Sequence, residues 1–267
     1  MVALPGFLYR NLAAGLTPTA TSSTTATGLG WDRLNDPQPR KRARVAATSA
    51  ILVFDLGSAQ SVDTWFLGST TLPAAATVRV RASTTDPTCV ASLLLDTGVQ
   101  SSVTDPEYVG NVVACFASTS ARYWRIDIAS ATNPIDIGIS SLGLLFRPVI
   151  SFDYGAQEGR LDLSARDRNP DTGAAYGLTL PKPKVRLLTF ANLSQAEVRN
   201  LTTSFDDMDR YVGASGDVLF VEDSDATWAE RARDSVYGSY RETAGSVLAS
   251  RMQLDRWSRT FRMEQRL

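Results

Sequence analysis

The sequence of 267 residues predicts a mainly β protein with a β-sandwich in its N-terminal half and an α+β domain after it. Short runs rich in β-branched and aromatic residues, separated by turn formers, recur without helical periodicity up to residue 146. One helical pattern, over residues 193–212, is then followed by three more strand-like runs. The chain is long enough for two domains of ordinary size, and 43% of its residues are hydrophobic.

Seven segments of the N-terminal half are expected to be strands. Residues 123–128 show the pattern clearly, because Trp124 and Ile126 point to one face of a strand while Arg125 and Asp127 point to the other. Short strands with turn signals between them are typical of a sandwich. The seven segments are residues 50–56, 62–67, 77–82, 92–95, 111–116, 123–128 and 135–146.

The chain is expected to divide into an N-terminal arm (1–30), the sandwich (31–147) and the α+β domain (148–267), with the boundary at Arg147-Pro148. Residues 16–27 are small, polar and uncharged. Such a segment lacks the apolar area to order itself, so we expect an exposed strand or loop that becomes ordered only against a neighbour.

The helix over residues 193–212 is predicted by several independent signals. Ser194 and Glu197 have the spacing of a capping box, and Leu193 and Val198 occupy the hydrophobic-staple positions. Gly213 stands where a helix C-cap belongs. Strands are expected on either side of this helix, at residues 186–190, 217–222, 235–240 and 257–264.

Composition argues against several classes of function. Histidine is absent, which removes Ser-His-Asp and Cys-His catalysis and every histidine metal site. The acidic runs lack the spacing of a calcium loop, so we expect no bound metal. We also expect that the protein has no cofactor and is not an enzyme. A glycosidase that uses two carboxylates stays open, because such a pair cannot be recognised from sequence. A net charge of −1 gives no overall attraction to nucleic acid or to an anionic membrane.

Cysteine content and hydropathy give weaker indications. Cys89 and Cys115 are expected to be reduced, buried thiols, although a bridge between the two neighbouring strand regions is conceivable. The apolar runs are too short to span a membrane, and the N-terminus does not resemble a signal peptide.

The densest charge run, residues 40–44, has the sequence Arg-Lys-Arg-Ala-Arg, with Arg33 upstream. It could contact a glycan or a nucleic acid, but a salt-bridged or solvated loop is the simpler interpretation. Trp31 lies in a polar loop and is the candidate aromatic for stacking on a sugar, together with Arg33. Trp65 and Trp124 are expected in the core.

Two resemblances extend these predictions. An Asp-Leu-Gly strand, a Val-x-Val-x-Ala strand and an Arg-Tyr-Trp-Arg-Ile strand, in this order, resemble the discoidin-like (galactose-binding-like) jelly roll. That resemblance implies a binding or assembly module. The second half contains a Leu-Ser-x-x-Glu helix, a Gly-Asp-Val-x-Phe strand and a Trp-x-x-x-Phe-x-Met-Glu strand. It resembles the distal-tail or baseplate proteins of long-tailed (siphovirus-like) bacteriophages, whose core is a tail-tube-like small barrel with one packed helix.

The phage resemblance implies a structural virion protein at the tail tip, assembled in the host cytoplasm. It would form a homo-oligomeric ring that continues the tail tube and docks hub, fibre or tape-measure proteins. The alternative is a carbohydrate-binding, adhesin-type module with an accessory domain, for which a glycan would be the partner.

A ring would need complementary surfaces on one chain. We expect the helix to bury Leu201, Phe205 and Met208 and to leave Asp206 and Asp209 on its other side.

That acidic face could pair with arginines of a neighbouring copy, since arginine is favoured at interfaces. The competing interpretation is that these arginines are ordinary surface residues without a role in an interface. The arginines proposed for this contact are Arg256, Arg259 and Arg262.

Overall fold

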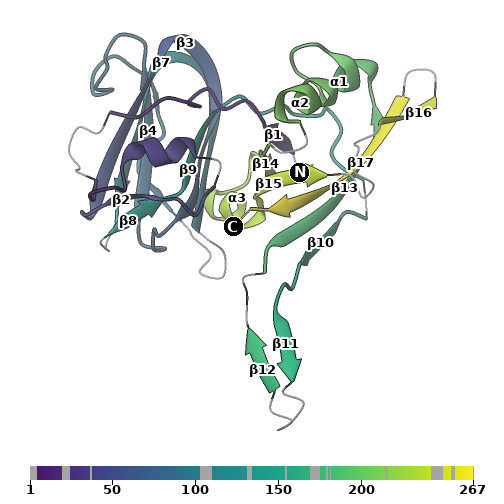
Figure 1. Cartoon of the computed structure of the whole chain (residues 1–267). Coiled ribbons are helices and arrows are strands. Elements are labelled where there is room, and N and C mark those ends of the chain that lie inside the picture. Colours follow the sequence, from purple (N-terminus) through teal and green to yellow (C-terminus); the bar gives the residue numbers. More distant parts are fainter. Residues whose placement is uncertain are drawn as a thin grey trace. The chain divides into compact units, whose positions relative to one another are not determined.

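The computed structural model describes residues 5–19, 25–36, 38–102, 110–130, 134–153, 155–168, 175–178, 180, 182–213, 216–241, 249–253 and 256–266 (Figure 1). The chain forms two compact units. The first unit comprises Met1–Pro148 and Leu219–Ser235, and the second comprises Val149–Val218 and Val236–Leu267. Leu219–Ser235 therefore groups with the sandwich, whereas the sequence suggested one continuous domain from residue 148 onwards.

The first unit is the predicted sandwich of the jelly-roll class. Its main sheet has the strand order β5-β4-β7-β3-β9, with β6 beside β4, and a second pair joins β2 to β8. The strands are β2 (Ala43–Val45), β3 (Ser49–Thr70), β4 (Thr77–Ser83), β5 (Leu93–Asp96), β6 (Gln100–Ser101), β7 (Gly110–Ala129), β8 (Ile135–Ile137) and β9 (Ile139–Gly143).

Two of these strands are far longer than the sequence suggests. The predicted segments 50–56 and 62–67 are both parts of β3, and 111–116 and 123–128 are both parts of β7. The two strands pair along their whole length, with register shifts, and Figure 1 shows the ribbon curving over. Within the register shift between Asp55 and Gln60, Gly57 adopts φ +76° and its N–H donates to the Asp55 carboxylate at 2.8 Å. The glycine at this position marks a bulge inside β3, whereas the sequence suggested that a strand ends here.

The sandwich core confirms the expected inward faces. Trp65 and Trp124 are 1% and 0% exposed, as predicted. The Trp65 indole N–H donates to the Ser140 hydroxyl at 2.9 Å, and the Phe54 ring packs edge-on against Trp65 with centroids 5.6 Å apart. The buried indole N–H thus has a partner, which removes the cost of burying it.

The segment 16–30 is more ordered than its composition predicts, in the part that the structure describes. Thr19 exchanges two backbone hydrogen bonds with Val53, at 2.9 and 3.0 Å. Ala26 donates to the Arg44 carbonyl at 2.9 Å, and Thr25 bridges to Val45. Backbone pairing to the sandwich of the same chain replaces the missing apolar contacts; residues 20–24 lie outside the described part.

A strand pair and a helix complete the first unit. Strand β1 (Gly6–Leu8) pairs antiparallel with β14 (Val218–Val221), and the Phe7 and Phe220 rings lie 5.2 Å apart. Helix α3 (Trp228–Asp234) packs against β7, where the Arg231 guanidinium donates to the Cys115 carbonyl at 3.1 Å. These contacts explain why Leu219–Ser235 groups with the sandwich.

The second unit is an α+β domain whose described sheet has the strand order β15-β17-β13-β10, with β16 also beside β17. β10 ends this order in the described residues. The elements are β10 (Gln157–Arg160), β11 (Ala165–Arg168), β12 (Ala175–Leu178), β13 (Lys184–Leu193), α1 (Gln195–Arg199), α2 (Phe205–Val212), β15 (Val236–Arg241), β16 (Ala249–Gln253) and β17 (Arg256–Gln265). β11 pairs with β12.

The prediction of one helix over residues 193–212 is wrong, because the helix is interrupted at residues 200–204. The first start and the last end are as predicted. Ser194 and Glu197 form the capping box that begins α1, and Gly213 ends α2 at φ +62°. Ser204 supplies a new N-cap by accepting from the Asp207 N–H at 3.1 Å. A serine hydroxyl that accepts a hydrogen bond from a backbone N–H in this way favours the first position of a helix over a position inside one.

The interruption changes one predicted core residue. Phe205 and Met208 are fully buried, as expected, but Leu201 is 71% exposed. It lies in the connection between α1 and α2, where the 3.6-residue spacing no longer applies. The Phe205 ring packs against Phe190 of β13, with centroids 5.6 Å apart.

Both cysteines are free, with Cys89 buried and Cys115 partly buried. Among the described residues, no helix has the length and hydropathy needed to cross a membrane.

Candidate functional site

The strand β2 places the first residues of a candidate binding pocket on the sandwich unit. Ala43 and Val45 are buried, so the alternation of side chains along the strand turns Arg44 outwards. Pairing of β2 with β8 sets Arg44 opposite Asp136. The guanidinium donates to both carboxylate oxygens, at 2.7 and 2.8 Å. This hydrogen bond raises the pKa of Arg44, and the bidentate geometry fixes both side chains.

The loop before β2 is held close to this strand pair. The Lys41 ammonium pairs with the Asp36 carboxylate at 2.8 Å, and the Gln38 N–H donates to the same carboxylate. A Cβ on Gly138 would lie 2.1 Å from the Pro39 carbonyl oxygen. Glycine at position 138 is therefore required for the loop to approach β8 and β9 so closely.

The result is a pocket of about 430 Å³ on the sandwich unit. Arg42 is anchored in it by a 3.1 Å hydrogen bond from its Nε to the Ser69 hydroxyl. Among the described residues that line it there are four guanidinium groups, one carboxylate and one aliphatic side chain, with no aromatic ring: Leu29, Arg33, Arg40, Arg42, Arg44 and Asp136.

Of the two residues predicted to contact a glycan, the structure places Arg33 in this pocket and removes Trp31 from it. Trp31 is 8% exposed and packs in the sandwich core with Leu34, from the 3-10 helix η1 (Trp31–Asn35). The prediction of a surface tryptophan was wrong, because Trp31 and its polar neighbours form a helical turn whose apolar side is buried. The spacing of three between Trp31 and Leu34 was the signal for a buried face.

Asp136 is the pocket residue that sequence reasoning missed. It is a lone carboxylate between Ile135 and Ile137, and it is 4% exposed. A charged residue between two buried isoleucines is the signal that could have marked it. Its partner could not have been named, because the pairing depends on the register of β2 and β8.

The predicted acidic face of the second unit is divided by its own ion pairs. Asp206 pairs with Arg210 one turn later on the exposed side of α2. Asp209 accepts instead from Arg259 and from the Tyr240 hydroxyl, both at 2.6 Å. Asp209 is thus engaged inside the unit, and the two aspartates do not form one exposed acidic surface.

The three arginines suggested for an interface lie on β17 and point in different directions. Arg259 is 2% exposed and faces the core, whereas Arg256 is exposed and donates to the Asn192 carbonyl at 3.2 Å. Arg262 lies 3.6 Å from Glu264 on the opposite face of the sheet. The structure does not gather them into one basic patch.

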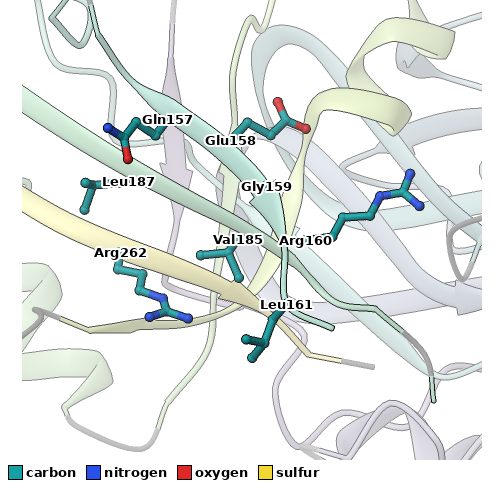
Figure 2. Close-up of a pocket in the computed structure, with 8 residues that line it drawn as sticks. All are labelled: Gln157, Glu158, Gly159, Arg160, Leu161, Val185, Leu187 and Arg262. Atoms are coloured by element: carbon teal, nitrogen blue, oxygen red, sulfur yellow. The ribbon is translucent and has the colours of Figure 1, made fainter. Parts of the chain in front are cut away.

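A second hollow, of about 390 Å³, lies on the second unit beside its edge strand β10 (Figure 2). Gly159 lies opposite Val185 and Gln157 lies opposite Leu187, so these four residues share one face of the sheet. A Cβ added to Gly159 would meet no atom within 4 Å, so this position borders open space. Arg262 adds a guanidinium beside the aliphatic side chains of Val185 and Leu187.

The two hollows differ in what they offer a ligand. The hollow of Figure 2 lies on a sheet face and mixes three aliphatic side chains with the polar residues Gln157, Glu158, Arg160 and Arg262. The arginine pocket instead gathers four guanidinium groups around a carboxylate that Arg44 fixes. Within the described ranges, no three cysteine, aspartate or glutamate side chains gather as a metal site would need. The arginine pocket is the stronger candidate because a few polar groups converge in it.

Comparison with known proteins found no matching family model and no matching curated protein. Solved structures do match. The chitosan-binding module 1 from a chitosanase/glucanase of Paenibacillus sp. IK-5 has 20% identity and a TM-score of 0.40, covering 50% of this chain and 98% of its own. A fucose-binding module of Streptococcus pneumoniae has 10% identity and a TM-score of 0.39, covering 51% and 98%. The lectin domain of lectinolysin, complexed with Lewis B antigen, has 15% identity and a TM-score of 0.37, covering 50% and 95%.

These findings correct the predicted function. The matched structures are carbohydrate-binding modules and a lectin domain, so the expected role in a phage tail tip or baseplate was wrong and the alternative fits better. At these TM-scores the matches say nothing of the ligand or of the residues that contact it. Both must follow from the residues of this chain.

Proposed function

We propose that this chain is a carbohydrate-binding module whose ligand occupies the arginine pocket of the sandwich unit. The observation that carries this proposal is the convergence of four guanidinium groups and one fixed carboxylate in a pocket of about 430 Å³. That volume lies within the roughly 300–1,000 Å³ of ligand pockets. Because fold alone does not fix function, the proposal depends on the chemistry of this pocket.

A sugar matches this set of groups. Each hydroxyl both donates and accepts a hydrogen bond. The planar guanidinium of Arg44 is held in place by Asp136 and keeps further N–H groups for adjacent hydroxyls, while the carboxylate retains lone pairs that accept from them. Since the described lining contains no aromatic ring, affinity would come from hydrogen bonds and charge instead of stacking on Trp31.

We further propose that the module binds without cleaving its ligand. Most glycoside hydrolases need two carboxyl groups that flank the bond to be cleaved. The described lining of the pocket offers Asp136 alone, and its two oxygens are already engaged by Arg44.

A glycan array with the full chain tests the proposal. We expect reproducible binding to a defined set of saccharides, and loss of that binding in Arg33→Gln and Arg40→Gln. The matched control is Lys41→Gln, which removes one positive charge from the same loop but none from the pocket lining. An array without any bound saccharide, or binding that both pocket variants retain, would overturn the proposal.

A further inference from the structure

We infer that the saccharide bound in the arginine pocket is acidic and carries a carboxylate or sulfate group that Arg33, Arg40 and Arg42 contact. This inference rests on the proposed function and adds the chemical class of the ligand. It follows from how positive charge is distributed among the four arginines of the pocket.

The charges of the pocket do not cancel. Arg44 is neutralised by Asp136 through two hydrogen bonds. Arg42 is held by a neutral hydroxyl, that of Ser69, which fixes its position without compensating its charge. Among the described residues, neither Arg33 nor Arg40 forms an ion pair.

One carboxylate of the loop beside the pocket is already engaged, that of Asp36. The pKa of Asp36 is lowered mainly by a hydrogen bond from Lys41, with a smaller effect of Arg33. Asp32, the other acidic residue beside Arg33, is exposed and does not line the pocket. Three guanidinium charges therefore converge on one pocket whose described lining supplies no further anion. Convergence of like charges is unfavourable unless something compensates it.

An anionic group on the ligand would supply that compensation. The guanidinium fork matches the two oxygens of a carboxylate or a sulfate, and such charge-assisted hydrogen bonds are about twice as strong as neutral ones. Neutral hydroxyls could accept the same hydrogen bonds but would leave the three charges uncompensated. Asp136 would in turn repel a second anion, so a hydroxyl is expected on its side of the pocket.

A polyanion of another class, nucleic acid, fits less well. Single-stranded nucleic acids are held by basic grooves with aromatic side chains that stack on the bases. The described lining has no such ring, and the net charge of the chain is −1.

The test is titration calorimetry with four probes of similar length: an oligogalacturonate, a heparin oligosaccharide, a neutral cello-oligosaccharide and a single-stranded oligonucleotide. We expect one acidic saccharide to bind at least tenfold more tightly than the neutral one, and to lose most of this advantage at high salt. The first two probes separate a carboxylate from a sulfate.

Variants locate the contact. Arg33→Gln and Arg40→Gln should each weaken binding of the acidic saccharide at least tenfold, because a hydrogen bond to a charged group is removed. Lys41→Gln should change it less than about twofold, as expected for an exposed charge outside the pocket. Thermal melting should show that all three variants remain folded.

The outcomes separate the two proposals. Equal binding of neutral and acidic saccharides, lost in the pocket variants, would overturn the acidic ligand and leave the binding module standing. Absence of binding to any saccharide would overturn both. Tightest binding of the oligonucleotide would also overturn both, and would make this pocket a nucleic-acid site.

Discussion

Removal of the Asp209 carboxylate should destabilise the second unit more than removal of the Asp206 carboxylate on the same helix α2. Asp209 accepts hydrogen bonds from Arg259 and from the Tyr240 hydroxyl, both at 2.6 Å. The Arg259 side chain is 2% exposed, and its guanidinium lies 4.8 Å from the centre of the Phe205 ring. Asp209→Ala would therefore leave a buried cation without its anion.

The expected loss can be set against a matched control on the same helix. Breaking a buried ion pair by removing one partner costs about 3–5 kcal/mol, because the remaining charge stays out of water. Asp206 pairs with Arg210 on the surface, and both side chains are more than 40% exposed. Such a pair contributes about 0.3–0.5 kcal/mol, so Asp206→Ala should lower the free energy of unfolding by no more than that.

Urea unfolding followed by circular dichroism measures both free energies. A double variant, Asp209→Ala with Arg259→Met, adds a second test, because replacing both partners by apolar groups is often neutral or stabilising. We expect this double variant to recover most of the stability that Asp209→Ala loses. Similar losses for Asp206→Ala and Asp209→Ala, or no recovery in the double variant, would refute the reasoning.

Three further predictions concern single residues. Trp31→Ala should lower the free energy of unfolding by about 3–5 kcal/mol in a denaturant titration, because Trp31 is buried in the core; a loss below about 0.5 kcal/mol would restore the surface interpretation. Burial raises the pKa of the Cys89 thiol to about 11, from an ordinary 9.0, so at pH 8 its thiolate fraction should be about a hundredfold lower than usual. Labelling with iodoacetamide should then be slow in the native protein and fast in denaturant. Burial also raises the pKa of Tyr240 above its ordinary 10.0. Since the folded protein holds this proton more tightly than the unfolded chain, the stability it contributes is complete below about pH 10 and is lost as the pH rises further. Tyr240→Phe should reduce the alkaline dependence of the melting temperature, and an unchanged dependence would contradict this assignment.

The second unit shows how far local sequence signals reach. The capping box of Ser194 and Glu197 and the C-cap at Gly213 were correctly predicted, because each depends on residues within a few positions of one another. The interruption at residues 200–204 was not, since the apolar spacing continues through it. Ser204 caps a second helix there, and this competes successfully with a continuous helix once Phe205 and Met208 are buried.

The sequence by itself determined the mainly β class, most strand positions and the burial of Trp65 and Trp124, because alternation along a strand is a local pattern. It also marked the basic loop and Arg33. Only the tertiary structure decided that Arg44 meets Asp136, since the register of β2 and β8 joins residues 92 positions apart. It likewise decided that Trp31 faces the core and that Leu219–Ser235 returns to the sandwich unit. Contacts of this kind depend on which surfaces are buried together, and no periodicity within one segment carries that information.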